Sequence, residues 1–169
     1  NATKFVLMNC SSDMLSTNSI YKKDDLELTD KWILSKLNKT KKKLSEFLND
    51  YKLGEAAKLI YEFAWNDFCD WYLEFLKLRF NDSMYENRII SETILKEILN
   101  EILIMMNPFM PHVTEELWHA LNRYSEDSLL SLQRWPNTLD TYFDEHLEQT
   151  FERVFEIIRL IRNLRAELG

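Results

Sequence analysis

The scarcity of glycine and proline limits what this chain can fold into more than any other feature of its sequence. Only two of the 169 residues are glycine and three are proline. Sheet-rich folds need turn-forming residues about every 8–12 positions, and this chain does not supply them. Apolar residues at helical spacing fill most of its length instead. We therefore predict an all-α helix bundle, built as a single domain over residues 1–169.

The apolar spacing also predicts where the helices lie. We expect helices over residues 1–9, 29–51, 55–80, 85–107, 112–124 and 144–168. Thr29 or Asp30 is a suitable N-cap for the second helix, and Gly54 is expected to interrupt the chain before the third. Residues 10–28 read as a polar loop, and 125–143 as a loop with an extended piece at 130–136. Both ends look cut from a longer chain, with helix 144–168 leading into further sequence.

Charge and cysteine content exclude several classes of protein. The net charge of −7 argues against binding nucleic acid by bulk charge, although a local basic patch remains compatible with it. Cys10 and Cys69 have no metal-binding or redox spacing and fit a reducing cytosol. The longest apolar run, at 102–106, is too short to cross a bilayer. The N-terminus lacks a signal-peptide pattern. We expect a cytoplasmic protein that contacts no membrane.

No catalytic or metal-binding set is recognisable in the sequence. His112, His119 and His146 are scattered, and no carboxylate or thiol pattern joins them into a site. Two glycines are too few for a loop that cradles phosphates. We therefore expect no catalytic residue, no metal and no cofactor within these residues.

A polar stripe runs along the aromatic segment "YEFAWNDFCDWYLEFLKLRF", residues 61–80. Its members recur every four residues: Glu62, Asn66, Asp70 and Glu74. Stacked carboxylates of this kind can bind a metal or perform acid–base chemistry. The alternative is a solvated line on an otherwise buried helix, partly paired with Lys58 and Lys77. The absence of histidine from the segment favours the solvated alternative.

Two basic surfaces are candidates for contact with phosphate. The first lies on one side of helix 29–51 and comprises Lys36, Lys39 and Lys43, with Lys41 and Lys42 adjacent. It suits a phosphate backbone, or a solvated lysine face that binds nothing. The second is the later half of helix 144–168, which carries Arg153, Arg159, Arg162 and Arg165 after an acidic first half. This order suits the helix dipole, and arginine also suits bidentate contact with phosphate.

Several motifs together resemble the anticodon-binding domain of bacterial valyl-tRNA synthetases. "FCDWYLE" at 68–74 resembles the signature of that family, and "NATKFVLMN" at 1–9 resembles its preceding helix. Four more stretches follow in the family's order: "LTDKWILSKLN" at 28–38, "NPFMPHVTEELW" at 107–118, "RWP" at 134–136 and "IRNLRAE" at 161–167. The chain departs from the pattern at Lys4, where arginine is usual, and at Leu78, Asn107 and His112.

The resemblance implies a function for the longer protein and roles for particular residues. A synthetase of this family attaches valine to its tRNA using ATP, whereas this fragment lacks the catalytic and editing domains. Its partners would be the anticodon stem-loop of tRNA-Val and the remaining domains. By resemblance, Phe5 stacks on an anticodon base, Leu73 is an apolar partner, and Lys4 and Asn1 add charge and edge contacts. The implied phosphate contacts are Lys36, Lys39, Lys43, Arg79, Arg162 and Arg165.

Two alternatives remain open at this stage. One is the anticodon-binding domain of a related synthetase, the isoleucine enzyme. The other is a helical module that binds a protein through its arginine helix and no RNA.

Overall fold

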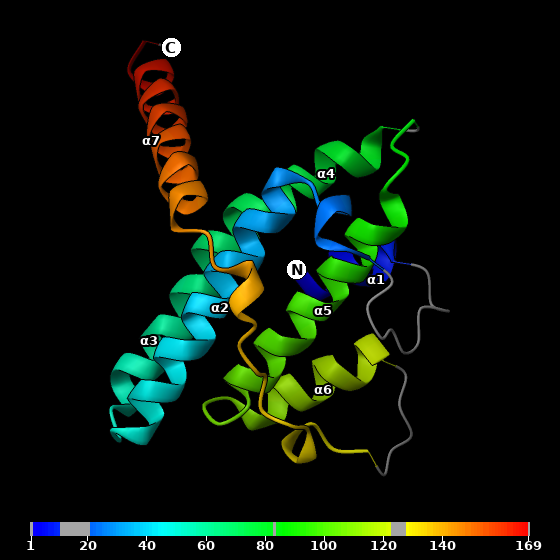
Figure 1. The fold of residues 1–169 in the computed structure, drawn as a ribbon, viewed down its shortest axis with the longest axis vertical. Coiled ribbons are helices and arrows are strands. Elements are labelled where there is room, and N and C mark those ends of the chain that lie inside the picture. Colours follow the sequence, from blue (N-terminus) through cyan, green and yellow to red (C-terminus); the bar gives the residue numbers. More distant parts are fainter. Residues whose placement is uncertain (1, 11–20, 83, 123–127, 169) are drawn as a thin grey trace.

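The computed structural model describes residues 2–10, 21–82, 84–122 and 128–168 and is shown in Figure 1. The described residues contain helices and turns and no β-strand, which confirms the predicted all-α class. The α-helices are α1 (Ala2–Asn9), α2 (Leu28–Asn49), α3 (Leu53–Glu62), α4 (Leu73–Asn81), α5 (Arg88–Met106), α6 (Pro111–Asn122) and α7 (Glu145–Leu168). A π-helix, η2 (Phe63–Tyr72), joins α3 to α4. Short 3₁₀ turns cover η1 (Lys23–Asp25), η3 (Leu130–Leu132) and η4 (Asp140–Tyr142).

The boundaries of α2 differ from the prediction at both ends. The backbone N–H of Glu27 donates to the Asp30 carboxylate at 3.2 Å, so Glu27 is the N-cap and Asp30 lies in the first turn. At the other end Tyr51 adopts a positive φ of 57°. The N–H groups of Tyr51 and Lys52 donate to the carbonyls of Leu48 and Phe47, which is the Schellman arrangement that closes a helix.

Gly54 is therefore not the residue that interrupts the chain. It lies inside α3, and a Cβ built on it would meet nothing within 4 Å. The break is made by the left-handed conformation of Tyr51, an uncommon choice for a residue with a side chain. The extended piece predicted at 130–136 is also wrong in its first part, because residues 130–132 form the turn η3.

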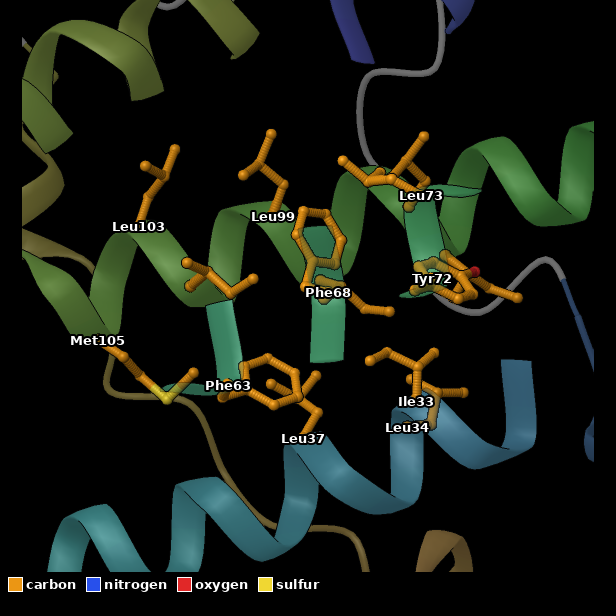
Figure 2. Close-up of a cluster of buried hydrophobic side chains, with 14 of the residues drawn as sticks. Ile33, Leu34, Leu37, Phe63, Phe68, Tyr72, Leu73, Leu99, Leu103 and Met105 are labelled. Atoms are coloured by element: carbon orange, nitrogen blue, oxygen red, sulfur yellow. The ribbon is translucent and has the colours of Figure 1, made fainter. Parts of the chain in front are cut away.

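The aromatic segment predicted as one helix does run continuously from α3 to α4, but its middle is π-helical. The N–H of Leu73 donates to the carbonyl of Phe68, five residues earlier. This spacing places Phe63, Phe68 and Leu73 on one buried side, where each is at most 5% exposed. Figure 2 shows the three among side chains of α2 and α5. In a regular α-helix, residues five apart point in different directions.

A buried polar group ties α2 to η2 and α4. Tyr72 donates its hydroxyl to the Asp30 carboxylate at 2.9 Å, and the Arg79 guanidinium donates to the same oxygen at 2.8 Å. Arg79 also donates to Ser91 on α5, at 3.2 Å, and to Thr29. Asp30 is only 1% exposed, and burying a charge is tolerated when it is paired and hydrogen-bonded in this way.

The first half of α7 packs on the bundle and its second half projects away from it (Figure 1). Phe155 stacks on Trp71 with ring centroids 3.8 Å apart and meets Trp32 edge-on at 5.1 Å. Phe151 stacks on Trp32 at 5.3 Å. Aromatic contacts of this kind add stability beyond the area they bury. From Arg159 to Leu168 every residue is exposed.

Candidate nucleic-acid interface

Phe5 on α1 belongs to a small cluster of stacked groups at one edge of the bundle. Thr3 and Val6 bury one side of α1, and this leaves Phe5 half-buried at its margin. The Phe5 ring stacks on Phe80 of α4, with centroids 6.1 Å apart and planes 10° apart. The Arg88 guanidinium lies 4.7 Å from the centre of the Phe80 ring. We call Phe5, Phe80 and Arg88 the α1 platform.

The contacts of Arg88 hold this platform in place. Its Nε donates to Glu92 at 2.7 Å and one terminal nitrogen donates to the Phe80 carbonyl at 3.1 Å. These bonds fix the guanidinium above the Phe80 ring, where a cation is attracted to the π face. Arg88 is paired with Glu92, so the platform offers single-stranded bases a partly exposed aromatic ring to stack on rather than a free charge.

The other residues expected beside Phe5 lie in different environments. Lys4 is exposed and forms no ion pair with any described residue. Leu73 is only 5% exposed and belongs to the core, so it supports the interior of the bundle and offers little surface to a ligand. Asn1 lies outside the described residues.

A second candidate surface is an open cleft between η2, α4 and α7. Its volume is about 640 Å³. Trp71 forms part of its lining, and the guanidinium groups of Arg159 and Arg162 each lie 5.6 Å from the Trp71 ring centre. The polar stripe supplies the remaining lining residues, Asn66, Asp70 and Glu74. We call this site the arginine cleft.

The arginine cleft combines hydrogen-bond donors with acceptors on an aromatic surface. Arginine recognises phosphate in a bidentate fashion, and carboxylate or amide side chains accept hydrogen bonds from base edges. Arg159 and Arg162 were expected on a basic face of the last helix, without a connection to Trp71. The missed signal was the spacing of Arg159 and Arg162, which follow Phe155 by four and seven residues and so share its helix face.

The contacts of Glu62 and Glu74 fit the interpretation of the polar stripe as a solvated line. Glu62 pairs with Lys58 at 3.7 Å, and Glu74 pairs with Lys77 at 2.5 Å. Within the described part of the chain, no group of three or more His, Cys, Asp or Glu side chains is arranged to hold a metal ion.

The lysines of α2 line a groove of about 210 Å³ against α3 and η2. Lys36 lies 3.5 Å from the Asp67 carboxylate, and Lys39 lies 3.2 Å from that of Glu148. Lys43 sits 5.5 Å above the ring of Phe47. The charges of Lys36 and Lys39 are therefore neutralised by acids of the same domain. Lys43 lies over an aromatic ring instead, so its charge is the most available of the three.

Burial raises the pKa of Asp67 to about 6, and Glu148 and Glu152 add to the rise while Lys36 opposes it. Asp67 is thus partly protonated in mildly acidic solution, and the charge that neutralises Lys36 then declines. The groove becomes more positive as the pH falls.

Two basic residues expected at the surface are structural instead. Lys41 is 2% exposed, and its ammonium group lies 3.0 Å from the Glu101 carboxylate. It does not belong to the exposed lysine face. Arg79, named as a phosphate contact, has its guanidinium committed to Asp30, Ser91 and Thr29 and is not available in this structure. Arg165 is exposed on α7 beyond the arginine cleft.

The two thiols are poor nucleophiles. Burial raises the pKa of the Cys10 thiol to about 12, and burial together with Asp70 raises that of Cys69. Both thiols are therefore protonated near neutral pH, and a protonated thiol is a poor nucleophile. His119 lies 3.3 Å from the Glu115 carboxylate. No helix among the described residues is both long and apolar enough to cross a membrane.

Comparison with known proteins gives the family. Residues 30–169 match the anticodon-binding domain of tRNA ligases. The chain belongs to this family. As a member of the anticodon-binding domain family, it resembles valine–tRNA ligases along its whole length. It is 58% identical over 170 residues to the valine–tRNA ligase of Prochlorococcus marinus subsp. pastoris, covering 100% of this chain and 18% of that relative.

More distant relatives carry the same name. The valine–tRNA ligase of Synechocystis sp. is 42% identical over 174 residues, and that of Fusobacterium nucleatum is 40% identical over 173 residues. Each comparison covers 100% of this chain and 19% of the relative. The anticodon-binding domain described here thus spans less than a fifth of the length of these relatives. The family match supports anticodon recognition over the alternative of a helical module that binds a protein through its arginine helix and no RNA.

Proposed function

We propose that this domain reads the anticodon of tRNA-Val as part of a cytoplasmic ligase that attaches valine to that tRNA with ATP. The reaction would take place in regions outside these residues, and the domain would contribute recognition only. The names of the relatives support valine over the isoleucine alternative.

The α1 platform is the observation that carries this proposal. Anticodon bases are single-stranded, and proteins read such bases by stacking and by hydrogen bonds to base edges. Phe5 is half-buried, is backed by Phe80, and lies in a cluster with Arg88 fixed above the Phe80 ring. Stacking of a base on Phe5 would contribute roughly 1–3 kcal/mol. The exposed ammonium of Lys4, next along α1, would add attraction to the phosphates.

The arginine cleft is a second point of contact in this proposal. Arg159 and Arg162 present two guanidinium groups beside Trp71, while Asp70 and Asn66 present acceptors. Because the net charge is −7 and most lysines of the α2 groove are paired, we expect weak and salt-sensitive RNA binding by the domain alone.

The test measures binding of the domain at low salt to a hairpin that carries the valine anticodon stem-loop. The same hairpin with its middle anticodon base changed is measured beside it, with the wild-type domain and with Phe5→Ala. Met8→Ala is the matched control, because Met8 is a 74% exposed apolar residue of the same helix. Circular dichroism checks that the variants retain their helices.

We expect the valine hairpin to bind better, Phe5→Ala to remove the difference, and Met8→Ala to preserve it. Equal binding of both hairpins by all three proteins would reduce the role of the domain to general phosphate attraction. No binding of either hairpin by the wild-type domain would contradict anticodon reading at these residues.

A further inference from the structure

Helix α7 carries an exposed apolar stripe that begins in its first half and continues along its projecting half. Its members alternate in spacing between three and four residues: Val154 (43% exposed), Ile157 (56%), Ile161 (51%), Leu164 (57%) and Leu168 (86%). We call this stripe the α7 seam. Spacing of this kind is the pattern by which one helix packs along another.

The α7 seam is distinct from the face that joins α7 to the bundle. Phe151, Phe155 and Ile158 pack against the core, and Arg159 and Arg162 continue that face into the arginine cleft. At 3.6 residues per turn, the seam lies about 140° around the helix from Phe155. Among the described residues, the face of α7 that carries Phe155 packs against the core, whereas the members of the seam are exposed. The second half of the helix projects away from the bundle (Figure 1).

Exposed leucine and isoleucine side chains in a continuous line indicate an interaction surface. Single exposed apolar residues are normal on a protein surface. Five exposed apolar residues aligned on one face over about four helical turns require an explanation. The residues beside the seam indicate the chemistry of the partner. Arg153 and Glu167 lie along one edge of the seam and Arg165 along the other, where the flanking residues of paired helices meet. A matching helix would present an apolar stripe with acids opposite Arg153 and Arg165.

We propose that the α7 seam packs along an amphipathic helix from another part of the same ligase polypeptide. The matched segment is only 18% of the Prochlorococcus relative, so most of that protein lies outside the domain. A helix in the same polypeptide meets the seam at an effective concentration near the millimolar range. A helix of a separate molecule does not reach that concentration in dilute solution, so the tethered helix is favoured. The proposal rests on membership of a longer ligase and does not require that the domain read the anticodon.

Site-specific photo-crosslinking in the full-length ligase tests this pairing. A benzophenone amino acid replaces Leu164 in the seam, and in a matched protein it replaces Asn163, an exposed neighbour on the polar side of α7. After irradiation, mass spectrometry identifies the peptides joined. We expect the probe at position 164 to join a segment of the same chain outside residues 1–169, with apolar residues at three- and four-residue spacing. The probe at position 163 should give at least roughly tenfold less of that product.

Hydrogen exchange gives an independent readout. In the full-length ligase, Leu164→Asp should accelerate amide exchange over residues 154–168 by roughly tenfold or more, because it places a charge in a packed seam. Leu132→Asp is the control, since Leu132 is 77% exposed and lies outside α7. It should leave α7 exchange unchanged.

Four results would overturn the proposal. Crosslinks between two ligase molecules would assign the seam to a second copy, and crosslinks to bound tRNA would assign it to RNA. Crosslinks into residues 1–169 would mean that α7 folds back on its own bundle. The absence of any product at position 164, with equally fast α7 exchange in wild type and Leu164→Asp, would show that the seam is solvated.

Discussion

The backbone N–H of Leu73 donates to the carbonyl oxygen of Phe68. This five-residue step changes which side chains share a face of the central helix. Phe63, Phe68 and Leu73 are all buried, although in an α-helix they would point in three directions. π-helical segments are uncommon and often occur near functional sites, and this one contributes Trp71 to the arginine cleft.

Replacing Phe68 with alanine should destabilise the domain by about 3–5 kcal/mol, because the ring is 1% exposed and its loss leaves a cavity. Denaturant unfolding measures the change. Trp65→Ala is the control in the same π-helix, since Trp65 is 56% exposed and stacks on the exposed Tyr61 at 6.0 Å. It should cost less than about 1.5 kcal/mol. Equal losses would mean that the register of η2 is not the one described.

Lys41 and Glu101 should behave as a coupled pair. Lys41→Met leaves the Glu101 carboxylate without its cation in a mostly buried position, at a cost of about 3–5 kcal/mol. The double variant Lys41→Met with Glu101→Leu should recover most of that loss, because no unpaired charge remains. A double-mutant cycle in urea measures the coupling. Additive effects of the two changes would place Lys41 in solvent instead.

Stability should depend on pH through Asp67. Its pKa is raised to about 6 in the folded state from an ordinary value of 3.8. Between these values the folded chain holds a proton that the unfolded chain has released, so stability falls as the pH rises from about 4 to about 6. Above pH 6 the penalty is complete, at roughly 2–3 kcal/mol.

Unfolding of wild type and Asp67→Asn between pH 4 and pH 7 checks this contribution. The variant should lack the part of the pH slope that belongs to Asp67, and NMR titration of the Asp67 carboxyl should give a midpoint near 6. Identical pH slopes in the two proteins would contradict the assignment.

Arginine substitutions in the arginine cleft should weaken hairpin binding and reduce its salt dependence. Arg162→Ala should lower the slope of log K against log salt by roughly 0.7–0.9, the value for one phosphate contact. Arg162→Lys should keep most of the slope but lose affinity, because lysine lacks the planar group that lies by Trp71. Arg153→Ala removes the same charge from α7 outside the cleft. If Arg153→Ala and Arg162→Ala behave alike, the cleft makes no specific contact.

The sequence alone determined the helical class and most helix positions. Near-absence of glycine and proline excluded sheets, and apolar spacing located the helices to within a few residues. The resemblance of "FCDWYLE" and its companion motifs pointed to the family that residues 30–169 match. These features are local, because helix formation depends on residues three to five positions apart.

Tertiary structure decided what the charged and aromatic groups do. Lys41 and Arg79 looked like surface cations, yet each meets a carboxylate far away in sequence, Glu101 and Asp30. The sequence predicts Trp71 as a core residue only, but packing of α7 beside it makes its ring part of the arginine cleft. Helical spacing shows which residues share a face but not what that face meets. Burial and pairing depend on contacts between distant segments, so only the assembled bundle separates a structural ion pair from a charge available to RNA.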